Sequence, residues 1–246
     1  MHIGILGGSF NPLHNDHIEL LNYIYKKLSL DRFILIPNAL PPHKTTCHVS
    51  FNDRVDMINK TVENLPYITV SMVEQDDSIP HYSFDTISEL KQQFKNDSLY
   101  FCMGMDSFNY LDKWYRGLQI PDLCNLVITD RTGYDIEKSN SAVIEKLSDR
   151  IVKLEGKIDD LSDLEIIREI KNSEQPKIIY LKKEFTDISS SKIRTVFKDF
   201  YQKYSNSLQN FENFKEFDSN YYVMQNLPES ITRYILENRL YADWKS

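Results

Sequence analysis

A glycine-rich loop between two apolar segments constrains the fold of this chain more strongly than any other feature. Residues 3–6, Ile-Gly-Ile-Leu, form an apolar run that predicts a first buried strand, and the apolar spacing over residues 17–28 is helical. The loop between them, residues 7–17, reads Gly-Gly-Ser-Phe-Asn-Pro-Leu-His-Asn-Asp-His. Its small residues let a ligand approach the backbone closely, and the N–H groups of a helix start favour an anion. The pattern therefore predicts a strand, a phosphate-binding loop and a helix.

The next apolar run, residues 32–37, ends in proline and predicts a second strand. A strand, a helix and a second strand in this order indicate a βαβ unit, whose strands are parallel and whose ligands bind beyond the carboxyl ends of the strands. Further strands are expected at residues 67–71, 99–103, 125–129 and 177–181, and helices at residues 51–62, 81–94 and 227–238. We therefore expect one α/β domain over residues 1–246, with a Rossmann-like parallel sheet and flanking helices.

Two segments depart from this alternation of strands and helices. Over residues 137–175 the apolar positions from Ile144 to Leu161 recur at three- and four-residue intervals, which predicts an amphipathic helical insertion. An alternative for this heptad-like seam is a subunit contact, so a homo-oligomer is possible. Residues 200–222 are rich in Tyr, Phe, Asn and Lys without a clear period, and we expect a smaller insertion there.

Composition excludes several functional classes. Hydrophobic residues make up 41% of the 246 residues, enough for a sizeable core, and a net charge of −7 argues against a general nucleic-acid surface. The first apolar run is far too short for a signal peptide, and no stretch approaches the ~18 apolar residues of a membrane span. The three cysteines form no C-x-x-C pair and are odd in number, which favours a reducing cytoplasm.

The loop contains neither a P-loop motif nor the G-x-G-x-x-G dinucleotide fingerprint. Residues 8–17 read G-x-F-x-P-x-H-x-x-H instead, which resembles the first signature of the nucleotidylyltransferase superfamily. In that superfamily the two histidine positions, here His14 and His17, hold the nucleoside triphosphate. Asp16 stands where the family usually has glycine, and a carboxylate there should repel a triphosphate unless it points away. On the residues alone, the two histidines could equally be a solvated or capping pair.

A second run of hydroxyl residues lies most of a domain away. Residues 188–194, Ile-Ser-Ser-Ser-Lys-Ile-Arg, place several hydroxyls ahead of a helix and Arg194 one turn into it, which predicts a second phosphate-binding helix start. The run resembles the second superfamily signature, I-S-S-[ST]-x-x-R. Alone it could be an N-cap, but the occurrence of both signatures in one chain makes coincidence improbable.

Three further segments resemble the bacterial nicotinate-nucleotide adenylyltransferases of that superfamily. They are residues 41–44, Pro-Pro-His-Lys; residues 82–86, Tyr-Ser-Phe-Asp-Thr; and residues 113–115, Lys-Trp-Tyr. The resemblance implies that Lys44 contacts a phosphate, Thr86 contacts the mononucleotide, and Trp114 stacks on the pyridine ring beside Tyr115. By themselves a surface lysine, a helix-start threonine and a core tryptophan are the simpler interpretations.

Two more positions follow strand ends. Asp106, after Gly104, could cap the next helix, accept from ribose hydroxyls or hold a metal. Gly-x-Asp at this place resembles the family motif for the adenosine side. Arg131 lies where the family commonly has Arg-Pro-Gly. It is a weak candidate for contact with a phosphate or with the adenine side of ATP, and the alternative is an arginine in a solvated loop.

The resemblance implies transfer of the adenylyl group of ATP to nicotinate mononucleotide, giving nicotinate adenine dinucleotide and pyrophosphate, with Mg²⁺ accompanying ATP. We find no Ser-His-Asp or Cys-His arrangement that would supply a covalent nucleophile. The implied catalytic residues are His14, His17, Lys44 and Arg194; the ATP site comprises Gly7, Gly8, Ser9, Phe10, Gly104, Asp106, Arg131, Ile188, Ser190 and Ser191; the mononucleotide site comprises Thr86, Trp114 and Tyr115. Transfer to another acceptor, such as nicotinamide mononucleotide or phosphopantetheine, remains an open alternative. A non-catalytic nucleotide sensor is a second one.

Overall fold

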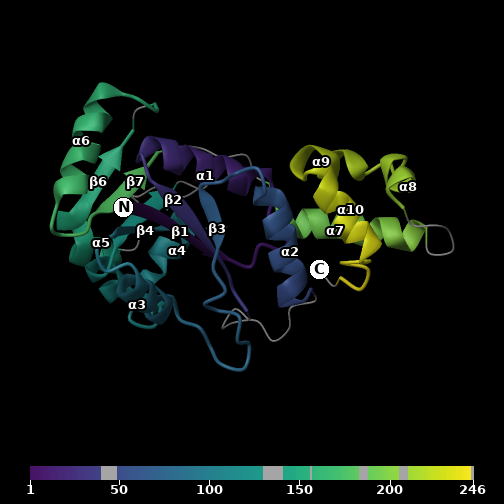
Figure 1. Ribbon diagram of the computed structural model, residues 1–246, viewed down its shortest axis with the longest axis horizontal. Helices are drawn as coiled ribbons and strands as arrows, with labels where there is room; N and C mark the ends of the chain where they lie inside the picture. The colour runs from purple at the N-terminus through teal and green to yellow at the C-terminus, as the bar shows by residue number, and fades with distance from the viewer. Residues whose placement is uncertain (40–48, 130–140, 156, 183–187, 205–209, 245–246) are drawn as a thin grey trace.

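A seven-stranded, all-parallel sheet organises the molecule, with strand order β3-β2-β1-β4-β5-β7-β6 (Figure 1). The computed structural model describes residues 1–39, 49–129, 141–155, 157–182, 188–204 and 210–244. The strands are β1 (His2–Gly8), β2 (Arg32–Pro37), β3 (Ile68–Val70), β4 (Ser98–Gly104), β5 (Asn125–Thr129), β6 (Ile151–Leu154) and β7 (Ile178–Leu181). The predicted Rossmann-like parallel sheet is therefore confirmed.

Helices connect the strands and close the chain. They are α1 (Asn15–Lys27), α2 (Phe51–Val62), α3 (Ser83–Gln93), α4 (Met105–Asn109), α5 (Ser141–Leu147), α6 (Leu161–Asn172), α7 (Ser190–Lys203), α8 (Phe211–Lys215), α9 (Asn220–Asn226) and α10 (Glu229–Glu237), with short 3₁₀ segments at Leu111–Lys113, Gly117–Asp122 and Ser148–Arg150. Helix α2 has the predicted bounds, and it begins where Ser50 Oγ accepts a hydrogen bond from the Asp53 N–H at 3.0 Å.

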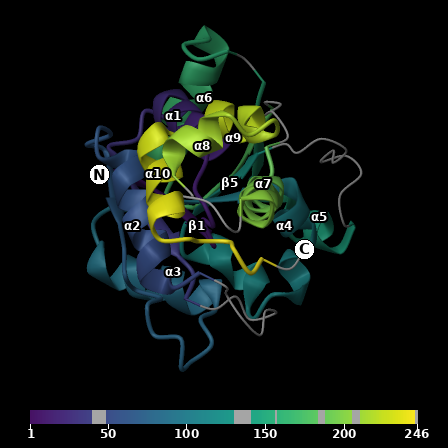
Figure 2. The same ribbon diagram turned by 90° about the vertical axis from the view of Figure 1, so that its right-hand side faces the viewer.

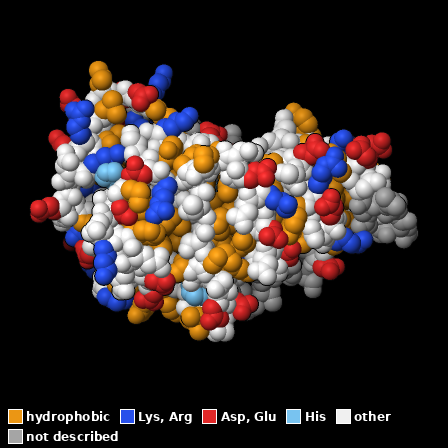
Figure 3. Space-filling view, in the orientation of Figure 1, with side chains coloured by type: hydrophobic (Ala, Val, Ile, Leu, Met, Phe, Trp, Pro, Cys, Tyr) orange, Lys and Arg blue, Asp and Glu red, His pale blue; other side chains and the backbone are white. Residues whose placement is uncertain are grey.

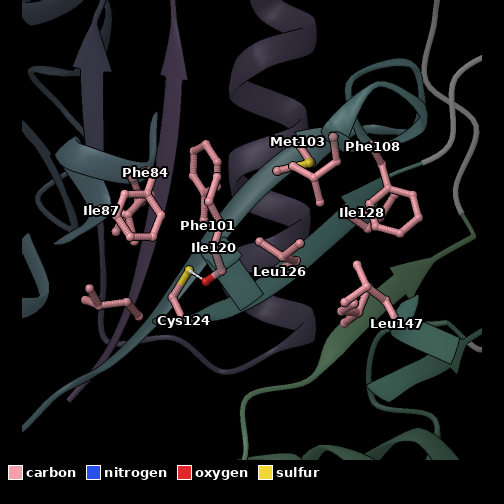
Figure 4. Close-up of a cluster of buried hydrophobic side chains, with 14 of the residues drawn as sticks. Phe84, Ile87, Phe101, Met103, Phe108, Ile120, Cys124, Leu126, Ile128 and Leu147 are labelled. Carbon is pink, nitrogen blue, oxygen red and sulfur yellow. Dashed lines mark hydrogen bonds between the residues drawn. The ribbon is translucent and has the colours of Figure 1, made fainter. Parts of the chain in front are cut away.

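Alternate residues of each strand enter two separate cores, because successive side chains of a strand point to opposite faces. In β4, Phe101 and Met103 join the core beneath α3, α4 and α5, whereas Tyr100 and Cys102 join the core beneath α1, α2 and α6. Figure 4 shows the first of these cores, where Phe84 of α3 lies near Phe101 of the sheet. Burial on both faces explains why the strands read as continuous apolar runs.

A third core lies among the helices α7–α10, which stand beyond the sheet on the right of Figure 1. Phe197 of α7 stacks on Phe214 of α8 with ring centroids 5.0 Å apart, and Phe200 meets Phe214 edge-on. The aromatic residues around 200–222 thus form a core of their own. No helical period was visible there because α8 and α9 are each only one to two turns long.

The predicted helical insertion over residues 137–175 is wrong in its central part. Residues 151–154 form β6, which pairs in parallel with β7 from Ile151↔Ile178 to Leu154↔Leu181. The three-residue spacing of Ile151 and Leu154 fits a helix face, but a strand of four residues with two β-branched side chains pairs at the sheet edge instead. The segment therefore contains a strand between α5 and α6, and the heptad-like seam does not form as one helix.

An ion pair of buried side chains holds α6 against α1. Lys27 Nζ lies 2.5 Å from Asp163 Oδ2 and also donates to the Lys157 carbonyl at 2.6 Å. The side chains of Lys27 and Asp163 are only 1% and 6% exposed. Helix α6 follows the edge strand β6, and α1 follows the first signature loop and carries His17. This pair therefore links the edge of the sheet to the helix that carries His17.

The surface is mixed in character. On the face shown in Figure 3, acidic and basic side chains are interspersed around a strip of hydrophobic ones. In the described part of the chain, no helix combines the length and the apolar character needed to cross a bilayer.

Candidate active site

The order in which the chain adds strands to the sheet reverses between β1 and β4, which are neighbours near the centre of the sheet. From β1 the chain proceeds outward to β2 and β3, then returns to β4 on the other side of β1 and continues to β5. In parallel α/β sheets, ligands bind in the crevice at such a switch point, beyond the carboxyl ends of the strands. The glycines Gly7, Gly8 and Gly104 lie at this edge.

These three glycines meet different surroundings. A Cβ on Gly7 would have its nearest neighbour 4.0 Å away, so the space beside it is open to a ligand. A Cβ on Gly8 would lie 3.2 Å from the Phe10 ring, and one on Gly104 would overlap Asp106 Oδ1. The Asp106 carboxylate therefore folds back over Gly104. Gly104 itself holds the N-cap position of α4, so the interpretation of Asp106 as that cap is wrong.

A cavity of about 430 Å³ opens at the switch point. All three predicted mononucleotide contacts, Thr86, Trp114 and Tyr115, line it together with Gly7 and Gly104. The resemblance implies an ATP-side role for the two glycines, so the ends of β1 and β4 border the cavity that the three predicted mononucleotide residues line. The two halves of the predicted site therefore adjoin each other.

Aromatic side chains form one wall of the cavity. Trp114 is half-buried, packs against the core under α3 and also lines the cavity, so packing in the core does not remove its ring from the cavity wall. Tyr82, at the start of α3, packs on Tyr115 with ring centroids 4.8 Å apart. Both tyrosines are exposed, at 37% and 50%. Tyr82 belongs to the motif at residues 82–86, but the resemblance implies no role for it.

The buried carboxylate of Glu74 orients two side chains that line this cavity. Glu74 is 5% exposed; its Oε1 accepts from Thr86 Oγ1 at 2.7 Å and its Oε2 accepts from Asn38 Nδ2 at 2.6 Å. Since Thr86 gives its proton to Glu74, its oxygen can act toward a ligand as an acceptor. Sequence reasoning missed Glu74 and Asn38 because neither belongs to a recognised motif.

The histidines of the first signature lie side by side at the start of α1. The ring centroids of His14 and His17 are 3.8 Å apart, and the backbone N–H of His14 donates to His17 Nδ1 at 3.3 Å. When His17 is neutral, this contact places its proton on Nε2. Phe10 meets the His17 ring edge-on at 5.7 Å and is 4% exposed, so its side chain supports His17.

His14 is buried, at 5% exposure, and its Nδ1 has no hydrogen-bond partner among the described residues. Burial lowers the pKa of His14 from 6.5 to about 4. In the ligand-free protein at pH 7 this imidazole is therefore neutral. In this state His14 carries no positive charge for a triphosphate, and it can act as a neutral hydrogen-bond donor.

We expect His14 to destabilise the protein in mild acid. Because the pKa of His14 is lower in the folded chain than in the unfolded chain, the unfolded chain takes up the proton first. The free energy of unfolding should therefore fall as the pH decreases from 6.5 to 4, by at most about 3 kcal/mol from this group. Urea unfolding of the wild type and His14→Asn across this range measures it, and parallel pH profiles of the two proteins would contradict it.

The second signature packs directly on the first. Arg194 is buried; its Nη1 donates to the Asn11 carbonyl at 2.6 Å and its Nη2 to Ser191 Oγ at 2.7 Å. Ser190 Oγ donates to the Pro12 carbonyl at 3.2 Å. The start of α7 is thus tied to the loop after β1, and the structure brings both signatures to one place.

Asp16, the departure from the family pattern, takes part in the same junction. Its Oδ2 accepts a hydrogen bond from the Ile188 N–H at 3.1 Å. The carboxylate is thus engaged by the backbone of the second signature, 172 residues away in the chain. Asp16 therefore contributes to joining the two signatures.

A buried arginine that sequence reasoning missed holds the loops after β1 and β2. Arg54 of α2 is 1% exposed; its Nη1 donates to the Ser9 carbonyl at 2.9 Å and its Nη2 to the Ala39 carbonyl at 3.1 Å. Two predicted site residues, Lys44 and Arg131, lie outside the described residues.

The comparisons with known proteins agree with this geometry. The profile of the family described as cytidylyltransferase-like matches residues 5–196. The nicotinate-nucleotide adenylyltransferase of Bacillus subtilis is 36% identical over 138 residues, which cover 55% of this chain and 72% of the relative. The probable nicotinate-nucleotide adenylyltransferase of Geotalea daltonii is 29% identical over 244 residues, 99% of both chains.

A solved structure is similar over the whole chain. It is the nicotinic acid mononucleotide adenylyltransferase of Plasmodium falciparum complexed with NaAD, which aligns with a TM-score of 0.65 over 99% of this chain and 98% of that one. At 18% sequence identity, this likeness shows the shared fold.

Proposed function

Since this chain belongs to the cytidylyltransferase-like family and, within it, to the nicotinate-nucleotide adenylyltransferases, we propose that it transfers the adenylyl group of ATP to nicotinate mononucleotide. The products are nicotinate adenine dinucleotide, an intermediate of NAD biosynthesis, and pyrophosphate. The observation that carries this proposal is the junction of two half-sites at the switch point. The aromatic cavity ends on Gly7 and Gly104, and the histidine-bearing loop continues from Gly8.

The transfer is a single displacement. A phosphate oxygen of the mononucleotide attacks the α-phosphorus of ATP, the bond from that phosphorus to the bridging oxygen breaks, and the electron pair leaves with pyrophosphate. Such chemistry depends on positioning and on stabilising charge in the transition state. The chain supplies donors for this: the Nε2–H of His17, the backbone N–H groups near Gly8 and Ser9, and the start of α7.

We propose that the cavity holds the mononucleotide through its aromatic wall and the start of α3. Trp114 offers a ring face to the pyridine, and Tyr82 and Ser83 at the first turn of α3 also line the cavity. The amino end of a helix favours a carboxylate over a neutral carboxamide. This supports the acid mononucleotide as the preferred acceptor.

Mg²⁺ is the metal that we propose to accompany ATP. Among the residues described, no group of three or more His, Cys, Asp or Glu side chains could hold a metal ion. Mg²⁺ keeps several of its waters and binds through one or two carboxylates plus substrate phosphates. We propose that Asp106, whose carboxylate lies over Gly104 at the end of β4, accepts a hydrogen bond from such a water or from the ribose.

The cysteines support a reducing compartment. Cys102 and Cys124 are free and buried, and burial raises the pKa of each thiol, so neither is poised to react. We propose that the enzyme works in the cytoplasm.

Replacing Trp114 with alanine should raise KM for nicotinate mononucleotide about tenfold while KM for ATP changes less than twofold. The ring lines the cavity, and loss of an aromatic stacking face is worth roughly 1–3 kcal/mol per base in comparable stacking sites. Steady-state kinetics with each substrate varied in turn measure the split. Equal increases in both KM values would contradict the assignment of this cavity to the mononucleotide.

Product analysis tests the proposal itself. The protein is incubated with ATP, Mg²⁺ and nicotinate mononucleotide, and the dinucleotide and pyrophosphate are quantified together. Equimolar formation is expected. A dinucleotide formed only with phosphopantetheine, or ATP binding without turnover on any acceptor, would overturn the proposal in favour of another transferase or a nucleotide sensor.

A further inference from the structure

The segment after α10 lies against α7 and the first signature loop. After α10 the backbone turns back, and Figure 2 shows this yellow segment running from α10 toward α7. We propose that this C-terminal strap, residues 239–244, is a positioning element for ATP. It fixes the Arg194 guanidinium and the loop at Asn11. The inference rests on the proposed function, and it takes from the resemblance to the second signature that Arg194 contacts the triphosphate.

The first contact of the strap is with Arg194 itself. The Trp244 ring lies 3.9 Å from the guanidinium carbon of Arg194, measured to the ring centroid. An arginine over a tryptophan face is attracted by the ring quadrupole, and more strongly when the pair is shielded from water. Arg194 is 7% exposed, so the ring covers a guanidinium that also donates to Asn11 and Ser191. The plane of the guanidinium is thereby fixed.

The second contact is with the first signature loop. Tyr241 OH donates to Asn11 Oδ1 at 2.8 Å, and Tyr241 is 3% exposed. Arg194 donates to the backbone carbonyl of the same Asn11. The strap therefore reaches Asn11 directly through Tyr241 and indirectly through Trp244 and Arg194. Both contacts converge on the loop that leads to His14 and His17.

The backbone of the strap adopts a conformation that most residues avoid. Arg239 and Tyr241 have positive φ angles of 52° and 71°. Non-glycine residues in this region persist where surrounding contacts hold them. The Tyr241 ring also packs on Phe197 of α7, at 6.0 Å between centroids.

A positioning role predicts an effect on one substrate. If the strap holds Arg194 in place for the triphosphate, then without the strap the arginine must become ordered when ATP binds. That ordering costs free energy and weakens ATP binding. The mononucleotide cavity is lined by other elements and should be unaffected. A strap that merely stabilises the fold would lower activity without changing either KM.

The first test compares three variants of the strap in steady-state kinetics. Trp244→Ala should raise KM for ATP roughly tenfold, with KM for nicotinate mononucleotide within twofold of wild type. Trp244→Phe should recover most of this loss, because a phenyl ring retains a face for Arg194. Asp243→Ala, an exposed neighbour on the same strap, is the matched control and should behave as wild type. A wild-type KM for ATP in Trp244→Ala would overturn the inference.

The second test uses fluorescence and does not depend on turnover. The chain has only two tryptophans, Trp114 and Trp244, so Trp114→Phe leaves Trp244 as the single reporter. Its emission should change on titration with a non-hydrolysable ATP analogue. No response to the analogue, in a protein shown by calorimetry to bind it, would overturn the inference. Absence of pyrophosphate release in the wild type would instead overturn the proposed function.

Discussion

Replacing His17 with alanine is expected to lower kcat by about 10²–10³-fold, the usual cost of removing a donor that stabilises transition-state charge. The structure indicates which ring nitrogen of His17 carries the proton. The backbone N–H of His14 donates to His17 Nδ1, which leaves Nε2 as the proton-bearing nitrogen of the neutral ring. Because the interaction strengthens as charge develops on the transferring phosphoryl group, kcat should fall more than KM for either substrate changes.

Two variants make this prediction specific. His17→Asn should recover part of the lost rate, since an amide N–H can occupy part of the same position. His2→Ala is the matched control, because His2 lies at the opposite end of β1 from the signature loop. The measurement is pyrophosphate release at saturating substrates. A kcat within threefold of wild type in His17→Ala would remove His17 from the catalytic residues.

Replacing Asp163 with alanine is expected to lower the free energy of unfolding by about 3–5 kcal/mol. The change leaves the Lys27 ammonium, whose side chain is 1% exposed, without the carboxylate that lies 2.5 Å away. A buried charge without its counter-charge is strongly unfavourable, so the loss should exceed that of an ordinary core polar contact. Urea unfolding followed by far-UV circular dichroism measures the difference.

A surface ion pair supplies the control for this variant. Glu229 and Arg233 are one helical turn apart on α10, and their side chains are 54% and 45% exposed. Glu229→Ala should change stability by less than about 0.5 kcal/mol, because solvent screens the pair. A double variant, Lys27→Met with Asp163→Leu, should recover much of the loss. Similar stabilities of Asp163→Ala and Glu229→Ala would show that α6 is not held to α1 by this pair.

The elements that the sequence predicted well are those with a local cause. Helix α2 has its expected bounds because Ser50 caps it and its apolar spacing is regular. The central strands β1, β2, β4 and β5 are long apolar runs, which burial on both faces of a parallel sheet requires. The two signatures could be placed on loops because each follows a strand and precedes a helix.

The failures arise where tertiary pairing overrides a local pattern. Residues 151–154 have the spacing of a helix face, yet they pair with β7 because the edge of the sheet offers a partner strand. Glu74 and Arg54 have no motif, and their roles depend on contacts with residues 12 to 45 positions away. Tyr241 contacts Asn11 across 230 positions, a distance that no pattern in a single sequence reveals.

Asp16 illustrates a departure that only three-dimensional context explains. From the sequence, a carboxylate beside a triphosphate should repel it unless the side chain points away. The structure instead directs Oδ2 of Asp16 to the Ile188 N–H, so that the acidic residue joins the two signatures.

The central claim is adenylyl transfer to the acid mononucleotide, and pyrophosphate release tests it most directly. The rate is measured with ATP and Mg²⁺ and either nicotinate mononucleotide or nicotinamide mononucleotide as acceptor. The account predicts release with the acid and a clear preference for it over the amide, in keeping with the start of α3 at the cavity. Release with neither acceptor would contradict the account.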